Sequence, residues 1–335
     1  MTLAPIVLTC GEPASIAPEI TAKAWFALHE QPTECFFLVG DSNDFLLRTD
    51  VMGLRIPMVP ITNISQAQEV FSHALPILDV PMPKPSRPAW IDTRNSHFVI
   101  EVIKLATRLC LEKQVSAMVT NPIHKDALYA VGFKHQGHTD FLASLCATAD
   151  APVQEAMMLV ANGLRAVPIT VHVPLAQVPT LLTTEAIVAQ GRVVAKSLQQ
   201  WFGIARPRLC VTGLNPHAGE NGAMGTEEKT IIEPAVVQLQ RLGIDVHGPV
   251  SADTAFHAEA RTSYDAILCM YHDQALIPVK TLDFHGGVNV TLGLPFIRTS
   301  PDHGTALNLA GTGTARADSL IAAIKQAAEM ARTAA

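Results

Sequence analysis

DAILCMYHDQALIPVK, residues 265–280, contains an apolar run, then His272 and Asp273 side by side, and then a second apolar run that closes with Lys280. The first run has the length and composition of a buried β-strand. A polar pair directly after such a strand is informative, because ligands of open α/β sheets bind beyond the carboxyl ends of the strands. The stretch therefore predicts an α/β fold with a functional site where its strands end.

Six further short apolar runs repeat this strand pattern along the chain. They are PIVLTC (5–10), CFFLVG (35–40), SAMVTNP (116–122), EAMMLVA (155–161), AVPITVHVP (166–174) and RLCVTGLNP (208–216). Longer segments lie between several of them, and those at 96–114 and 184–203 have apolar residues three and four positions apart, as amphipathic helices do. The alternation predicts a mostly parallel sheet with helices on both faces. We expect the proline-rich stretch 75–90 to be an ordered surface excursion.

The composition argues against several classes of protein. The chain has 335 residues, of which 48% are hydrophobic and 16% charged, and a formal net charge of −6. A nucleic-acid partner is not expected, because no basic surface is available to neutralise phosphates. No segment has the uninterrupted apolar length of a membrane span, and the first residues lack a basic region before their apolar run, so we expect a cytoplasmic protein. The six cysteines form no C-x-x-C pair, and several lie inside apolar runs as small buried residues do, so neither a disulfide framework nor a cysteine zinc site is expected.

Three histidines follow strand-like runs and are candidate metal ligands. His172 follows the apolar residues of AVPITV (166–171), His217 comes directly after the run 208–216, and His272 ends the first apolar run of the stretch 265–280. Three imidazoles with an open fourth position are a known arrangement for a catalytic divalent metal. Their spacing matches no local metal motif, and the chain has 13 histidines. The alternative for each of them is an ordinary hydrogen-bonded histidine.

Other polar residues lie in positions where an anion could bind. His138, Thr139 and Asp140 follow a glycine at an expected helix start, which suits a phosphate, although a helix capped by Thr139 is the alternative. Residues 215–228 form a glycine-rich loop that runs into an expected helix start, and such a loop either approaches a ligand or simply turns. Arg298 suits a phosphate, a carboxylate or a structural ion pair.

Two common nucleotide-binding motifs are missing. The chain has no G-x-G-x-x-G, the nearest candidate being GTGTAR at 311–316, and GRVVAKS at 191–197 has alanine where a P-loop needs glycine. Neither a Rossmann site nor a Walker site is therefore predicted from the residues.

Six motifs taken together resemble one enzyme family. They are GEPASIAPEI (11–20), TNPIHK (120–125), GHTDFLA (137–143), LNPHAGENGAMGTEE (214–228), MYHDQALIPVK (270–280) and GVNVTLGLPFIRTSPDHGTALNLAG (287–311). In this order, and across nearly the whole chain, they are similar to the 4-hydroxythreonine-4-phosphate dehydrogenases of vitamin B6 (pyridoxal phosphate) biosynthesis. The resemblance implies a two-lobed, three-layer α/β/α fold like that of the isocitrate and isopropylmalate dehydrogenases, which bind NAD without the Rossmann fingerprint.

The resemblance also implies an activity and a set of site residues. The family oxidises 4-phosphooxy-L-threonine with NAD, or NADP, to 2-amino-3-oxo-4-phosphooxybutanoate, which decarboxylates to 3-amino-2-oxopropyl phosphate. It uses a divalent metal, for which zinc, magnesium and cobalt are candidates. By position, the implied metal ligands are His172, His217 and His272; the implied substrate-binding residues are His138, Thr139, Lys280, Asn289 and Arg298; and the implied catalytic residues are Lys280, Asp253 and Asp273.

The resemblance implies an organisation as well. The first lobe is expected over residues 1–130 and 300–335, and the second, carrying the metal and phosphate residues, over 131–299. The expected assembly is a homodimer with the active site at the interface, acting on a small phosphorylated substrate with no nucleic-acid or membrane partner.

The sequence departs from the family pattern at four positions. Ser15 and Ala17 stand where glycines are usual, Ala223 where a histidine is common, and Gly286 where an arginine is frequent. These departures leave open another phosphorylated four-carbon acid as substrate, such as 4-phosphoerythronate or 4-phosphothreonate. A phosphotransferase or phosphohydrolase of similar architecture and a non-catalytic binding protein are further alternatives.

Overall fold

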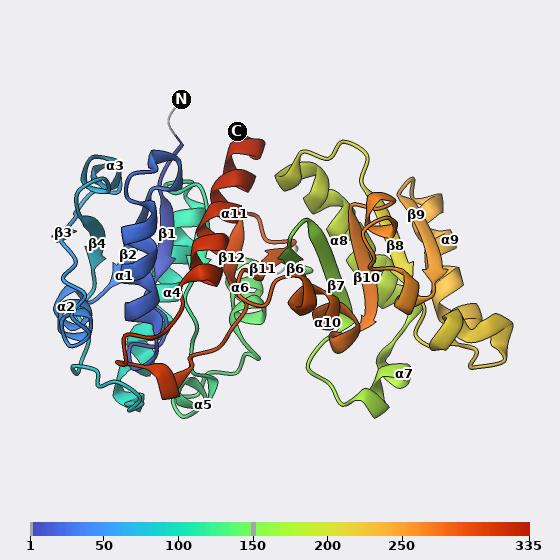
Figure 1. Ribbon diagram of the computed structural model, residues 1–335, viewed down its shortest axis with the longest axis horizontal. Coiled ribbons are helices and arrows are strands. Elements are labelled where there is room, and N and C mark those ends of the chain that lie inside the picture. Colours follow the sequence, from blue (N-terminus) through green and yellow to red (C-terminus); the bar gives the residue numbers. More distant parts are fainter. Residues whose placement is uncertain (1–2, 149–151) are drawn as a thin grey trace. The chain divides into compact units, whose positions relative to one another are not determined.

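A computed structural model describes residues 3–148 and 152–335, which fall into two compact units (Figure 1). Apart from the last two residues, the first unit comprises Met1–Ala151 and Leu294–Thr333, and the second comprises Pro152–Gly293. The second unit is thus inserted into the sequence of the first.

The first unit is built on parallel strands. Their order is β3-β4-β2-β1-β5-β12, and every neighbouring pair is parallel. The strands are β1 (Ile6–Thr9), β2 (Phe36–Gly40), β3 (Met58–Pro60), β4 (Leu75–Asp79), β5 (Met118–Thr120) and β12 (Arg298–Pro301). The α-helices are α1 (Ala17–Leu28), α2 (Ser42–Asp50), α3 (Gln66–Val70), α4 (Ser96–Leu111), α5 (Lys125–Tyr129), α6 (His138–Cys146) and α11 (Asp318–Ala334). All residues of β1, β2, β5 and β12 are buried, as expected for strands covered on both faces.

The second unit has a mixed sheet in the order β11-β6-β7-β10-β8-β9. The strands are β6 (Ala156–Ala161), β7 (Leu164–Thr170), β8 (Arg208–Thr212), β9 (Asp245–Val250), β10 (Ala266–Tyr271) and β11 (Val288–Leu292). The α-helices are α7 (Val178–Leu181), α8 (Thr184–Phe202), α9 (Glu233–Arg241) and α10 (His272–Leu282). Strand β6 pairs antiparallel with both β7 and β11, whereas β7, β10, β8 and β9 are parallel. Asn162 and Gly163 connect β6 to β7 with φ of 45° and 80°, which suits a tight hairpin turn.

The predicted α/β fold is confirmed, and each of the seven predicted strand runs contains a strand. Five strands were not predicted, namely β3, β4, β9, β11 and β12. Strand β4 occupies the first residues of the stretch 75–90, which is therefore only partly a surface excursion. All six cysteines are free, as expected. Within the described residues, no helix is long and apolar enough to cross a membrane.

The predicted lobe boundaries differ from the two compact units. Residues 131–148 and 294–299 belong to the first unit, because α6 contacts α4 and β12 pairs with β5 through Arg298 and Met118. His138, Thr139 and Arg298 therefore lie in the first unit, whereas the three candidate metal ligands lie in the second.

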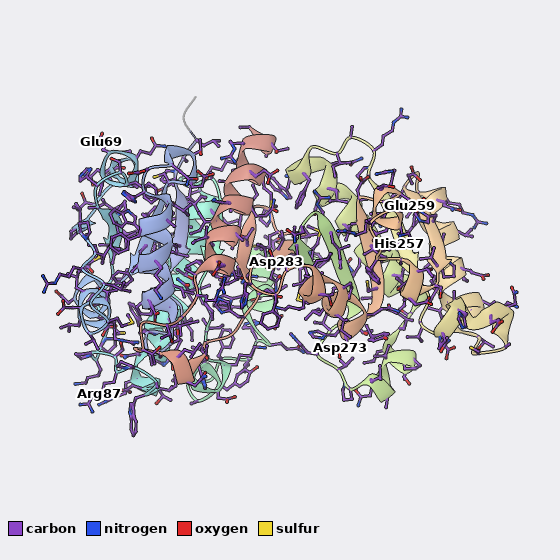
Figure 2. All side chains as sticks on the ribbon, in the orientation of Figure 1. Glu69, Arg87, His257, Glu259, Asp273 and Asp283 are labelled. Carbon is purple, nitrogen blue, oxygen red and sulfur yellow. The ribbon has the colours of Figure 1, made fainter. Side chains whose placement is uncertain are left out.

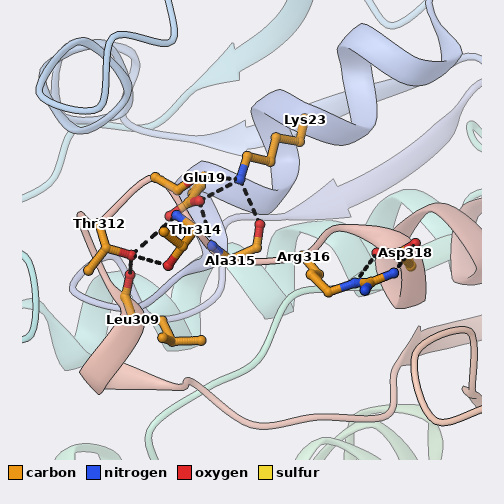
Figure 3. A network of polar contacts seen from close by, with 9 residues as sticks. Glu19, Lys23, Leu309, Thr312, Thr314, Ala315, Arg316 and Asp318 are labelled. Carbon is orange, nitrogen blue, oxygen red and sulfur yellow. Dashed lines mark hydrogen bonds and ion pairs between the residues drawn. The ribbon is translucent and has the colours of Figure 1, made fainter.

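An ion pair between the half-buried Lys23 and the buried Glu19 fastens the segment before α11 to α1 (Figure 3). Lys23 Nζ donates to the carbonyl oxygens of Gly313 and Ala315 at 2.8 and 2.7 Å and to Glu19 Oε1 at 2.7 Å. The carboxylate of Glu19, which is 1% exposed, also accepts from Ala315 N at 2.8 Å. The charged pair satisfies backbone groups that no strand or helix would satisfy, so the segment has a fixed path.

Candidate active site at the strand ends

Three adjacent parallel strands of the second unit end beside the three candidate metal ligands. Strand β10 pairs with β7 on one side and β8 on the other. His172 follows β7 by two residues, His217 lies in the turn after β8, and His272 is the first residue of α10. Because parallel strands end at the same edge of a sheet, all three histidines lie at one edge of this unit.

His172 and His272 are neighbours. Their ring centroids are 5.6 Å apart, and together with Asp273 they line a cavity of about 270 Å³. His272 Nδ1 donates to Asp273 Oδ1 at 2.7 Å. Asp273 lies at the start of α10 (Figure 2). A carboxylate only accepts hydrogen bonds, so the contact places the ring proton on Nδ1 and leaves the Nε2 lone pair of His272 available for a ligand.

His217 lies in an unusual turn. Five consecutive residues, His217–Asn221, have φ between 42° and 75°, the left-handed region. His172 has φ of 38° and is left-handed too. Each residue with a side chain is less stable by about 1–2 kcal/mol in this conformation, and such backbone persists only where its surroundings hold it. Two of the three candidate ligands are thus presented from strained backbone.

Asp253 is the charged neighbour of His217. The Ser251 hydroxyl donates to Asp253 Oδ1 and is the main cause that lowers the pKa of this carboxyl, with a smaller contribution from the nearby His217 imidazole. Asp253 is therefore an anion next to the turn that carries His217. This position is compatible with the active-site role predicted for Asp253 from the sequence, and that role stays a prediction.

The residues at this edge fit a divalent metal in part. Imidazole nitrogens are good ligands for zinc, cobalt and nickel. Over residues 3–148 and 152–335, no three side chains of His, Cys, Asp or Glu lie close enough together to hold a metal ion. The His172–His272 pair supplies two suitable donors facing one cavity, and His217 as the third ligand stays a prediction.

A second polar cluster lies in the first unit, around the start of α6. His138 is the first residue of this helix, after Gly137, and its Nε2 is buried without a hydrogen-bond partner among the described residues. Burial holds the pKa of His138 well below its usual range, and the cations Arg298 and Lys125 lower it further. Thr139 is inside the helix and makes no cap, so the alternative of a threonine N-cap is wrong.

Arg298 is the buried cation of this cluster. It is 3% exposed, and burial lowers the pKa of its guanidinium to about 9. Its Nη2 donates to Thr120 Oγ1 at 2.5 Å, across the β5–β12 pair. A buried guanidinium next to a buried, unpartnered ring nitrogen and the first backbone N–H groups of a helix suits an anion such as phosphate.

The remaining predicted residues lie in the second unit. Lys280 is in the last turn of α10, with Nζ 5.4 Å from the centroid of the Phe284 ring. Asn289 is in β11, and its buried Oδ1 has no hydrogen-bond partner within the described part of the chain. Their roles in substrate binding, and that of Lys280 in catalysis, stay predictions.

Three residues of interest were not singled out from the sequence. Lys125 lies within the TNPIHK motif and contributes positive charge at His138. Glu228 and Gln274 are buried beneath the histidine-bearing strand ends. A lysine beside a proposed anion site was a usable signal, whereas the contacts of Glu228 and Gln274 appear only in the folded chain.

The fold and the polar strand ends define an α/β protein of the class that binds small ligands at the carboxyl edge of a parallel sheet. The family described as "Pyridoxal phosphate biosynthetic protein PdxA" matches residues 33–327. The chain belongs to this family.

Its relatives match over nearly their whole length. The chain is 50% identical to the 4-hydroxythreonine-4-phosphate dehydrogenase of Caulobacter vibrioides, covering 99% of this chain and 98% of the relative. It is 48% identical to the protein of that name from Maricaulis maris, covering 98% of each. The crystal structure of a 4-hydroxythreonine-4-phosphate dehydrogenase from Klebsiella pneumoniae superposes with a TM-score of 0.87 at 38% identity, covering 98% of this chain and 99% of that one.

Proposed function

We propose that this protein is an NAD-dependent and metal-dependent 4-hydroxythreonine-4-phosphate dehydrogenase of vitamin B6 biosynthesis. The names of its relatives supply the substrate. The observation that carries the proposal is the unpartnered, buried Nε2 of His138 near the buried cation Arg298, because a phosphate would hydrogen-bond to this ring nitrogen and be attracted by the guanidinium. NADP is the alternative coenzyme.

The reaction is an oxidation followed by loss of carbon dioxide. The secondary hydroxyl of 4-phosphooxy-L-threonine loses its proton to a base and its hydride to the oxidised nicotinamide, which gives 2-amino-3-oxo-4-phosphooxybutanoate. This 3-oxo acid then loses carbon dioxide and takes up a proton to give 3-amino-2-oxopropyl phosphate. A zinc, cobalt or magnesium ion held by His172, His217 and His272 would supply Lewis-acid polarisation of the reacting oxygen.

The chain's own residues bind, orient and move protons. His138, Thr139 and Arg298 are assigned to the phosphate, with Lys125 adding positive charge. Asp273 orients the His272 ring by accepting from Nδ1 at 2.7 Å. Lys280 and Asp253 are assigned to proton transfer, and Asn289 and Lys280 to substrate binding.

A steady-state assay tests the proposal. The purified protein is incubated with NAD, a divalent metal and 4-phosphooxy-L-threonine, and NADH absorbance and free phosphate are followed together. We expect NADH to form without phosphate release. Phosphate release without NADH would instead indicate a phosphotransferase or phosphohydrolase. Stabilisation by both ligands without turnover would indicate a binding protein.

A second candidate substrate is favoured by one position. Gly286 stands where the family often has arginine, and an added Cβ would lie 2.2 Å from Asp283 Oδ2, so a side chain there would require the Asp283 carboxylate to move. Asp283 accepts from Gly286 N at 2.7 Å, so the carboxylate is committed to this turn. The altered turn favours testing 4-phosphoerythronate and 4-phosphothreonate, and kcat/KM for these acids and 4-phosphooxy-L-threonine decides among the three.

The same proposal includes the assembly and the location. We assign a cytoplasmic homodimer whose active site takes residues from both chains, since two-fold dimers are the commonest symmetric assembly. Subunit exchange between His138→Ala and His272→Ala chains tests the shared site. If the two residues belong to opposite chains of one site, mixed dimers keep one intact site and about a quarter of the wild-type activity returns. No recovery after confirmed exchange, with any pairing of site variants, would exclude it.

A further inference from the structure

Gln274 joins the ends of two histidine-bearing strands. It lies in the first turn of α10 and is 8% exposed. Its Oε1 accepts from Met270 N at 2.6 Å, in β10, and from Thr212 Oγ1 at 2.7 Å, in β8. Its Nε2 donates to Gly213 O at 2.8 Å, just beyond β8. One buried amide therefore fixes the carboxyl end of β10 to the carboxyl end of β8.

Thr170 extends this connection to the third strand. It is the last residue of β7, is 8% exposed, and its hydroxyl donates to Met270 O at 2.8 Å. The two backbone polar groups of Met270 are thus both held by side chains, one by Gln274 and the other by Thr170. Met270 cannot shift without breaking a buried hydrogen bond.

Glu228 holds the backbone between the end of β8 and the left-handed turn that carries His217. It is 2% exposed, and its Oε1 accepts from Leu214 N at 2.8 Å and Asn215 N at 2.7 Å. Its Oε2 accepts from Asn215 Nδ2 at 3.0 Å. The turn closes tightly over this carboxylate, since a Cβ on Gly219, which has φ of 75°, would lie 2.4 Å from Oε2.

In each of the three strand-end segments, a hydrogen bond holds the residue two positions before the candidate histidine. Thr170, Asn215 and Met270, each held by these hydrogen bonds, precede His172, His217 and His272 by two residues. We propose that Thr170, Gln274 and Glu228 are positioning residues that set the places of the three histidines for metal binding. This inference rests on the proposed function, because it presupposes that the histidines bind a metal.

The physical reason is preorganisation. Ligands held by buried hydrogen-bonded groups lose less freedom when they bind a metal, and changes in such supporting groups typically cost about 10–100-fold in metal affinity. Glu228 also stabilises a strained turn that would otherwise relax to right-handed backbone and carry His217 away.

A purely structural role is the competing explanation, and the chain offers a matched control. Asp265 precedes β10 and accepts from the backbone N of Arg208, the first residue of β8, at 2.8 Å and from its guanidinium at 3.0 and 3.3 Å. These contacts join the same two strands at their opposite ends. Asp265→Asn should lower stability without changing metal affinity.

The experiment measures Co²⁺ binding to the metal-stripped full chain by calorimetric titration, with no substrate or NAD present. Relative to wild type, we expect Gln274→Met and Glu228→Gln to raise the Kd for Co²⁺ by about 10–100-fold. Asp265→Asn should stay within about 2-fold, because distant sites behave independently. Thr170→Val, a milder change that keeps the side-chain volume, should raise the Kd less than Gln274→Met does and serves if either buried variant fails to fold.

The outcomes separate this inference from the proposed function. If wild type binds Co²⁺ and the folded variants bind it equally well, the positioning role is overturned while the metal site stands. An equal loss of affinity in Asp265→Asn would also overturn it, since general destabilisation would then explain the effect. If wild type takes up no Co²⁺, the metal site fails and the inference fails with it.

Discussion

The two polar clusters of this protein differ in burial. In the second unit, His172 and His217 are exposed at a sheet edge, and the groups that support them are buried beneath. In the first unit, Arg298 and the Nε2 of His138 are themselves buried. Exposed donors keep their hydration until a ligand arrives, whereas a buried cation has already lost its own. We therefore expect the histidine edge to determine turnover, and the His138 cluster to determine binding and stability.

The largest effect should come from the histidine edge. His272→Ala removes a proposed metal ligand, the ring that Asp273 orients. The activation free energy should rise by several kcal/mol, so kcat should fall by at least about a hundredfold. The melting temperature should change little, because the ring is partly exposed. Assays of kcat, elemental analysis and thermal unfolding check this. Equal metal content in wild type and in a triple alanine variant of His172, His217 and His272 would contradict the assignment.

Arg298→Ala should produce the next largest effect, and on a different parameter. Loss of a buried charge-assisted partner should weaken binding of the phosphorylated substrate by roughly 1.5–3 kcal/mol, which raises its KM about 10–150-fold. The KM for NAD should change much less. Arg208→Ala, which removes an arginine from the opposite end of the second unit's strands, is the control. A parallel rise in both KM values would show that Arg298 is structural.

The buried ring nitrogen of His138 predicts a pH dependence of stability. Its pKa is lowered in the folded state, so below the ordinary histidine pKa of about 6.5 the unfolded chain binds more protons than the folded one. The free energy of unfolding should then fall on acidification by at most about 1.4 kcal/mol per pH unit from this residue. His138→Gln should remove that part of the slope in urea titrations between about pH 7 and pH 5. Identical slopes in the two proteins would mean that His138 becomes protonated without penalty.

The smallest effect is expected for Lys125→Met. The lysine is exposed, so its contribution to anion binding is screened and a rise of a few-fold in KM for the phosphorylated substrate is expected. Because Lys125 lowers the pKa of His138 less than burial does, the pKa of His138 measured by NMR should rise only slightly. A change in KM as large as that of Arg298→Ala would place Lys125 in direct contact with the phosphate.

Much of the fold and the histidine edge was predictable because the signals are local. A run such as AILCMY is recognisable as a buried strand from its own residues, so the residue that follows it can be assigned to a strand end. Strand β12, RTSP, has no apolar residue except its proline, and β9, DVHGPV, is interrupted by polar residues and glycine, so neither has a strand signature. Their place is set by partners such as β5 and β8, which the sequence does not reveal.

The supporting residues were not predictable for a related reason. Gln274 contacts Thr212, which is 62 positions earlier, and Glu228 contacts Asn215, which is 13 positions earlier. Either residue, read alone, is a polar side chain on a helix. The predicted end of the second lobe at residue 299 differs from the end of the second compact unit for a similar reason, because Arg298 pairs with β5 of the first unit.

The insertion of one unit into the other also has a consequence for synthesis on the ribosome. All six strands of the second unit, ending with β11 at Leu292, precede β12 and α11 in the chain and therefore emerge from the ribosome before them. Strand β5 must therefore wait, with one edge open, until Arg298–Pro301 arrives to pair with it. The second unit can close while the first is still incomplete, so the N-terminal half of the chain is the part that a chaperone would need to protect during translation.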